Sequence, residues 1–193
     1  MMDEQITEFE HARRKAAERM GVTNRRLWPD NGEIQERLLE QQRLFGGSTY
    51  QDEQHSLLQQ SLAAMQLFVS FTPRLVGPVL AGTATRAQGI ELQVFTDNTE
   101  EIIWTLIDHR IPWSADQASF RYAGNQRQDH PIVRFLAGAV PVQIDVLPPK
   151  ARHNPPLDPV SNRPQRGASP DQVAQLLTET QCCIRSSPGN QDR

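Results

Sequence analysis

The sequence predicts an α+β fold in which N-terminal helices pack against a mixed or largely antiparallel sheet. Three observations carry this prediction. Apolar residues recur every three or four positions early in the chain, they form short strand-like segments between residues 75 and 147, and prolines gather after Leu147. At 193 residues the chain is long enough for one domain with a buried core.

Three helices are predicted before the sheet. The first spans residues 4–20, the second ends near Phe45, and the third begins near Tyr50 and stops before Pro73. Their apolar faces hold, in turn, Ile6, Phe9, Ala12, Ala16 and Met20; Ile34, Leu38 and Phe45; and Leu58, Leu62, Met65 and Val69. The broad apolar face of the third helix predicts that it packs directly under the sheet.

A central hairpin is predicted next, from the apolar segments Leu75–Leu80 and Ile90–Phe95. The turn between them is rich in small and polar residues, namely Gly82, Thr83, Thr85, Arg86 and Gly89. A glycine allows a ligand to approach the backbone, and an arginine fork suits phosphate. The turn is therefore a candidate ligand site, with an ordinary solvated hairpin tip as the alternative.

A helix and four further strands are predicted after the hairpin. Asp97 and Glu100 have the spacing of a capping box, and Ile103, Leu106 and Ile107 form the predicted buried side of the helix. The strands are expected at Ile111–Trp113, Ser119–Tyr122, Ile132–Leu136 and Val140–Leu147. In the last of these, alternation puts Asp145 on the face opposite the aliphatic row.

The segment after Leu147 has too many prolines for a long helix or a central strand, so it is expected to wrap the surface. Ser169 and Gln172 then form a capping box that predicts a short closing helix. The predicted organisation is an N-terminal helix and linker (1–30), the core (31–147), the proline-rich wrap with its closing helix (148–183) and a disordered tail (184–193).

Composition and charge exclude several classes of function. The net charge of -3 argues against a general nucleic-acid binder, although Lys150, Arg152, His153, Arg163 and Arg166 make the proline-rich segment locally basic. The adjacent cysteines Cys182 and Cys183 give no disulfide framework. The N-terminus lacks an apolar signal region and no stretch has the length of a membrane helix, so the cytoplasm is the expected compartment.

The central hairpin resembles the active-site hairpin of the nucleotidyltransferase superfamily, the polymerase-beta-like fold. The family's glycine and serine or threonine turn matches Gly82 and Thr83, its carboxylate pair falls on Gly89 and Glu91, and its third acid falls on Asp145. Two of the three carboxylates are therefore present. The span from about residue 31 to 177 is also similar to a group of short bacterial proteins of uncharacterised role, which are grouped with this superfamily by fold.

The resemblance implies a nucleotidyltransferase-like sheet and a Mg²⁺-dependent site. Glu91 and Asp145 would be the catalytic and metal-binding acids, and Gly82, Thr83, Thr85 and Arg86 would contact the phosphates of a nucleoside triphosphate. The alternative for the two acids is a pair of surface carboxylates on solvated strands, and for Arg86 a solvated loop arginine. Neither the acceptor of the transferred group nor the oligomeric state follows from the sequence.

Other chemistries lack their sequence motifs. Some members of the bacterial group are labelled UDP-N-acetylmuramate–alanine ligase, but such an enzyme is multidomain and needs an ATP-binding phosphate loop that this sequence does not contain. The five histidines are far apart, so a zinc site is not predicted. Two classes of function stay open: Mg²⁺-dependent transfer of a nucleoside monophosphate, and a catalytically inactive nucleotide-binding or protein-interaction module.

Overall fold

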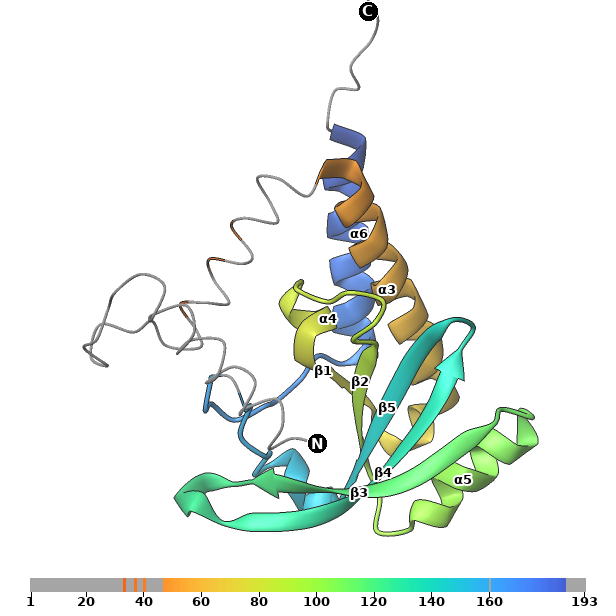
Figure 1. The fold of residues 1–193 in the computed structure, drawn as a ribbon, viewed down its shortest axis with the longest axis vertical. Helices are drawn as coiled ribbons and strands as arrows, with labels where there is room; N and C mark the ends of the chain where they lie inside the picture. The colour runs from red at the N-terminus through yellow and green to blue at the C-terminus, as the bar shows by residue number, and fades with distance from the viewer. Residues whose placement is uncertain (1–32, 34–36, 38–39, 41–46, 160, 187–193) are drawn as a thin grey trace, which may run out of the picture.

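A five-stranded mixed sheet organises the protein in the computed structural model, which describes residues 47–159 and 161–186 together with Glu33, Arg37 and Glu40 (Figure 1). The strands are β1 (Arg74–Val76), β2 (Ile90–Phe95), β3 (Trp113–Arg121), β4 (Arg127–Ala137) and β5 (Val140–Leu147). Their order across the sheet is β1-β2-β5-β4-β3. β2 and β5 are parallel, and the other neighbouring pairs are antiparallel.

Four α-helices accompany the sheet in the described part of the chain: α3 (Gly47–Leu67), α4 (Gly77–Ala81), α5 (Thr99–Asp108) and α6 (Pro170–Ser186). Short 3₁₀ turns are η2 (Val69–Phe71), η3 (Ala123–Asn125) and η4 (Pro149–Arg152). The predicted α+β class is confirmed. The predicted helix over residues 4–20, nearly all of the predicted helix that ends near Phe45, and residues 187–193 of the predicted tail lie outside the described residues. Residues 184–186 of the predicted tail belong to α6, which continues to Ser186.

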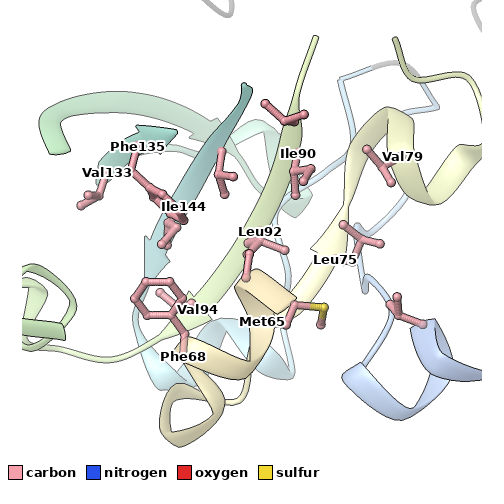
Figure 2. Packing of buried hydrophobic residues seen from close by; sticks show 14 of the residues in the cluster. Met65, Phe68, Leu75, Val79, Ile90, Leu92, Val94, Val133, Phe135 and Ile144 are labelled. Carbon is pink, nitrogen blue, oxygen red and sulfur yellow. The ribbon is translucent and has the colours of Figure 1, made fainter. Parts of the chain in front are cut away.

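The hydrophobic core lies between one face of the sheet and the helices. Met65 and Phe68 at the end of α3 pack beside Leu75, Leu92 and Val94 of β1 and β2 (Figure 2). Alternation in β2 and β5 sends Ile90, Leu92 and Val94 and their partners Val142, Ile144 and Val146 to this face. α5 adds Ile102 and Leu106, and α6 adds Val173, to the same cluster.

α3 and α6 run side by side and extend beyond the sheet (Figure 1). The predicted capping box of α6 is confirmed, because the Ser169 amide donates to Gln172 Oε1 at 2.8 Å and the Gln172 amide donates to Ser169 Oγ at 3.3 Å. Among the described residues, none of the helices has the length and apolar character that a membrane crossing requires.

Several predicted boundaries are wrong. The strand predicted over Leu75–Leu80 ends at Val76, because the chain turns at Gly77 into α4, whose first turn accommodates Pro78. The two strands predicted at Ile111–Trp113 and Ser119–Tyr122 are one strand, β3, since continuous pairing with β4 outweighs the low strand propensity of its middle residues.

Two predictions about the helices are also wrong. The N-cap of α5 is Asn98 rather than Asp97, and Asn98 Oδ1 accepts from the Glu100 amide at 3.1 Å. Val69 is 63% exposed because α3 has already ended and η2 breaks its periodicity. Ile107 is exposed as well, since Ile102 and Leu106 form the buried side of α5.

Candidate functional site

A row of polar side chains crosses the sheet on the face opposite the core, and we call it the polar row: Glu91 and Gln93 of β2, Gln143 and Asp145 of β5, and Arg134 of β4. The parallel register pairs Glu91 with Gln143 and Gln93 with Asp145. The antiparallel register pairs Gln143 with Arg134. Because paired residues of neighbouring strands share a face, these five side chains lie together.

The two acids named from the sequence, Glu91 and Asp145, are on this shared face, two residue steps apart in the register of β2 and β5. Asp145 is 2% exposed, and burial, followed by the charge of Glu91, raises its pKa to about 7. Burial also raises the pKa of Glu91, with a further contribution from the charge of Asp158. Asp145 is therefore a buried acid, not a solvated surface carboxylate, and burial disfavours the ionised form of both acids.

Gln93, which the sequence analysis did not select, lies beside both acids. Its side chain is 0% exposed, and its Nε2 donates to Gln165 Oε1 at 2.8 Å. Its Oε1 is buried with no hydrogen-bond partner. The sequence did contain a signal for Gln93. Side chains alternate along IELQVF, so residues 91 and 93 of one strand must face the same way.

Hydrogen bonds link the other members of the polar row. Gln143 Nε2 donates to Asp145 Oδ1 at 3.0 Å, and Arg134 Nε donates to Gln143 Oε1 at 3.1 Å. A second nitrogen of Arg134 donates to Asp116 Oδ2 of β3 at 3.3 Å. The guanidinium of Arg134 is thus engaged by neighbours on both sides.

A small aromatic group flanks the polar row on the same face, where Phe120, Tyr122 and Ile132 form a separate buried cluster. The Tyr122 hydroxyl lies 2.8 Å from His130 Nε2. Burial and then the charge of Asp145 raise the pKa of Tyr122 to about 12, and burial, assisted by Lys150, lowers that of His130. Both side chains are therefore neutral at pH 7, and the neutral imidazole Nε2 can accept from the tyrosine hydroxyl.

The proline-rich segment crosses this face, and we call residues 155–159 and 161–168 the strap. At one edge of the sheet the Leu157 amide donates to the Arg121 carbonyl of β3 at 2.6 Å. At the other edge Ala168 and Leu75 of β1 exchange two backbone hydrogen bonds of 2.8 Å. Gln165 contacts Gln93 between these anchors. The strap therefore bonds to the edge strands β3 and β1 and contacts the polar row at Gln93, and Figure 1 shows its blue trace passing β1 to reach α6.

The residues predicted to bind phosphate lie elsewhere, in the loop after α4. The Tyr50 hydroxyl donates to the Gly82 carbonyl, and Gln54 Nε2 donates to the Ala84 carbonyl. The Arg86 amide donates to Glu53 Oε1 at 3.2 Å, and Thr85 is bonded to Gln88 within the loop. These contacts attach Gly82 and Arg86 to α3, while Thr85 is bonded within the loop and the Thr83 amide donates to the Pro78 carbonyl of α4. None of the four residues has a hydrogen bond to Glu91 or Asp145 among the described contacts.

Two glycines, at positions 77 and 89, lie so close to their neighbours that no side chain would fit there. A Cβ on Gly77 would collide with the Glu91 carboxylate, so it is the backbone of Gly77 that lies against this acid. Gly89 has a φ of 78° and lies against the Pro141 carbonyl, where a Cβ would collide with backbone atoms. The position of Gly89 therefore has no room for an acidic side chain.

The donor set does not fit a hydrated Mg²⁺. Magnesium favours ionised carboxylates and keeps several of its waters, which require space around the ion. Here Asp145 is almost fully buried, and the neighbouring amide of Gln93 is bonded to the strap. Within the described ranges, no three His, Cys, Asp or Glu side chains gather in a way that would hold a metal ion.

Comparison with known proteins gives no assignment. No family model, no curated protein and no solved structure matches the chain.

Proposed function

We propose that the protein is a catalytically inactive nucleotidyltransferase-like domain that serves as a protein-interaction module. The observation that carries the proposal is the environment of Gln93. A neutral amide lies beside Glu91 and Asp145, and it is bonded to the strap of the same chain.

The proposed likeness in fold is supported by the sheet. β1 and β2 are antiparallel neighbours joined through α4, and Asp145 lies on the strand that runs parallel to β2. This arrangement brings Glu91 and Asp145 to one face, as the resemblance of the hairpin implies. A mixed sheet of five strands with helices on its core face is compatible with many functions, so the proposed function depends on the polar row and on the exposed side of α5.

Loss of transfer activity is supported by charge and access. Nucleotidyl transfer depends on positioned positive charge around the phosphates, usually a metal ion held by ionised carboxylates. Burial raises the pKa of both acids in the polar row, and the strap bonds to Gln93 beside them. The one cationic side chain of the polar row, Arg134, is engaged by Gln143 and Asp116.

A binding role is supported by α5. Trp104 is 58% exposed and Ile107 is 54% exposed, and residues three apart on a helix are neighbours on its surface. Trp113 at the start of β3 is a further exposed aromatic residue. Large exposed apolar side chains that lie together are typical of surfaces that contact other proteins.

A nucleotide screen tests the loss of activity. The melting temperature of the full chain would be measured with ATP, GTP, CTP and UTP, each with and without Mg²⁺. A ligand at 100 times its Kd adds about 2.7 kcal/mol to stability, which raises the melting temperature of a domain of this size by roughly 5–10 °C. We expect changes below about 1 °C.

The Asp145→Asn variant is the matched control, because it keeps the shape of the side chain and removes the charge. A Mg²⁺-dependent nucleotide shift in the wild-type protein that disappears in Asp145→Asn would contradict the proposal. Transfer of a labelled nucleoside monophosphate to any acceptor would contradict it as well.

A further inference from the structure

β3 is an open edge of the sheet. It is the last strand in the order β1-β2-β5-β4-β3, and among the described strands it pairs with β4 alone. The opposite edge, β1, has three residues and is bonded by the strap through Leu75 and Ala168. β3 has nine residues, and Trp113 to Gln117 are exposed. A long exposed edge presents unpaired backbone groups that another strand can bind.

Two hydrogen bonds show which backbone groups of β3 point away from β4. The Tyr122 amide is bonded across the hairpin, whereas the Arg121 carbonyl accepts from Leu157 of the strap. The register with β4 is one-to-one from Trp113 to Arg121, and in such a pair both backbone groups of a residue point to the same side. The residues of β3 that point outward with Arg121 are therefore Trp113, Ala115, Gln117 and Ser119.

Most of these outward groups are open. In the described part of the chain, no backbone hydrogen bond reaches the outward groups of Trp113, Ala115 or Ser119. The Gln117 amide donates to the side chain of its neighbour, Asp116 Oδ1, at 2.8 Å. β3 has no proline, no lysine and no bulge, which are features that protect edge strands from pairing. Asp116 is therefore the main obstacle to a partner strand.

The sequence of β3 suits antiparallel pairing with a second copy of itself. Outward residues must face outward residues, so the two-fold axis can pass through residue 115, 116 or 117. An axis at Asp116 would place two carboxylates opposite each other, which is destabilising. An axis at Gln117 would require Arg121, whose carbonyl is already bonded to the strap. An axis at Ala115 places Asp116 opposite Ser114 of the second copy, whose hydroxyl can donate to the carboxylate.

We propose that two copies of the chain associate through β3, paired antiparallel about Ala115, so that their two sheets join into one. The Gln117 amide of each copy leaves Asp116 and donates to the Trp113 carbonyl of the other copy. Asp116 accepts instead from Ser114 of the other copy. The small side chain of Ala115 allows the strands to approach at the axis. This inference goes beyond the proposed function, because it uses the edge of β3 and not the exposed side of α5.

Ala115→Glu tests the pairing, because it places two carboxylates opposite each other at the axis while Ala115 is exposed in the single chain. Sedimentation equilibrium of the full chain would be measured up to about 1 mM, where a dimer with a Kd of about 100 µM is mostly associated. We expect the wild type to approach twice the mass of one chain, and Ala115→Glu to associate at least about tenfold more weakly. A wild-type protein that stays monomeric throughout would overturn the inference.

Ala123→Glu is the matched control, because it makes the same change at an exposed alanine in η3, outside the proposed pairing. It should associate as the wild type does, and both variants should keep a melting temperature within about 2 °C of the wild type. Equal weakening by the two variants would show that added negative charge, and not the register about Ala115, controls association, and it would overturn the inference.

Amide hydrogen exchange of the wild-type protein gives a second test that needs no variant. In the proposed register the Ala115 amide is bonded between copies, whereas the Ser119 amide lies beyond the paired residues. We expect exchange at Ala115 to slow as the protein concentration rises, while exchange at Ser119 stays constant. An Ala115 amide that exchanges at the same rate at every concentration would show that the edge stays unpaired.

Discussion

At the residue scale, alternation predicted one side chain of the site correctly and missed another. Asp145 lies on the face opposite the aliphatic row of VPVQIDVL, as predicted. Gln93 was missed because an amide is not a catalytic residue type, and because its partner Gln165 is 72 residues away in the sequence. Contacts of that kind leave no local pattern, so only the fold shows them.

Gly89 carries a prediction at this scale, because the resemblance assigned a lost carboxylate to its position. Gly89→Asp should destabilise the protein by about 3 kcal/mol or more, since the left-handed backbone costs about 1–2 kcal/mol for other residues and collision with Pro141 adds to this. Urea unfolding would measure the change. Combining Gly89→Asp with Glu91→Asp should create no Mg²⁺ site, because a side chain at position 89 would collide with Pro141 and would not join the polar row.

Gly124 provides the control for Gly89. Its φ of 76° is nearly the same, but a Cβ there would meet nothing within 4 Å. Gly124→Asp should therefore lower the stability only by the cost of placing an aspartate in the left-handed backbone conformation. Equal losses at the two positions would show that Pro141 does not restrict residue 89.

At the element scale, periodicity identified the strands and the later helices but not all their boundaries. Ile90–Phe95 and Val140–Leu147 were predicted with the bounds that the structure has. The end of β1 and the continuity of β3 depend on pairing with β2 and β4, which a single segment does not encode. Which residues of α5 are buried also depends on how the helix is placed on the core, so Ile107 was assigned to the wrong side.

α5 carries a prediction about its exposed side. Replacing Trp104 and Ile107 together by serine should leave the melting temperature within about 2 °C of the wild type, because neither side chain belongs to the core. Ile102→Ser in the same helix should destabilise the protein by several kcal/mol, since Ile102 is fully buried. Thermal unfolding of both variants by circular dichroism makes the comparison. A large loss in the double variant would show that its exposed side supports the fold, not an interaction.

At the scale of the whole molecule, one main hydrophobic cluster joins the sheet to the helices. Among the described residues, this cluster extends from Leu57 to Leu177. The fold class followed from the order of patterns along the sequence. The position of the strap did not follow from the sequence, because extended proline-rich segments have no periodicity that indicates which surface they cover.

Removal of residues 1–30 tests whether the rest of the chain folds without them. The shortened protein should still unfold cooperatively in urea, with a slope close to that of the full chain, because the slope follows the surface that unfolding exposes. Loss of the cooperative transition would mean that the predicted N-terminal helix is part of the core.

The pairing of α3 with α6 affects the order in which the protein can fold during synthesis. α3 leaves the ribosome first among the described helices, yet its neighbour α6 is made more than a hundred residues later. The strap, which bonds to Gln93, also follows the last strand. A nascent chain that has completed β5 therefore exposes an apolar side of α3 and an uncovered polar row, and contacts so distant in sequence form slowly. Chains that stall after residue 147 should be the ones that most need a chaperone.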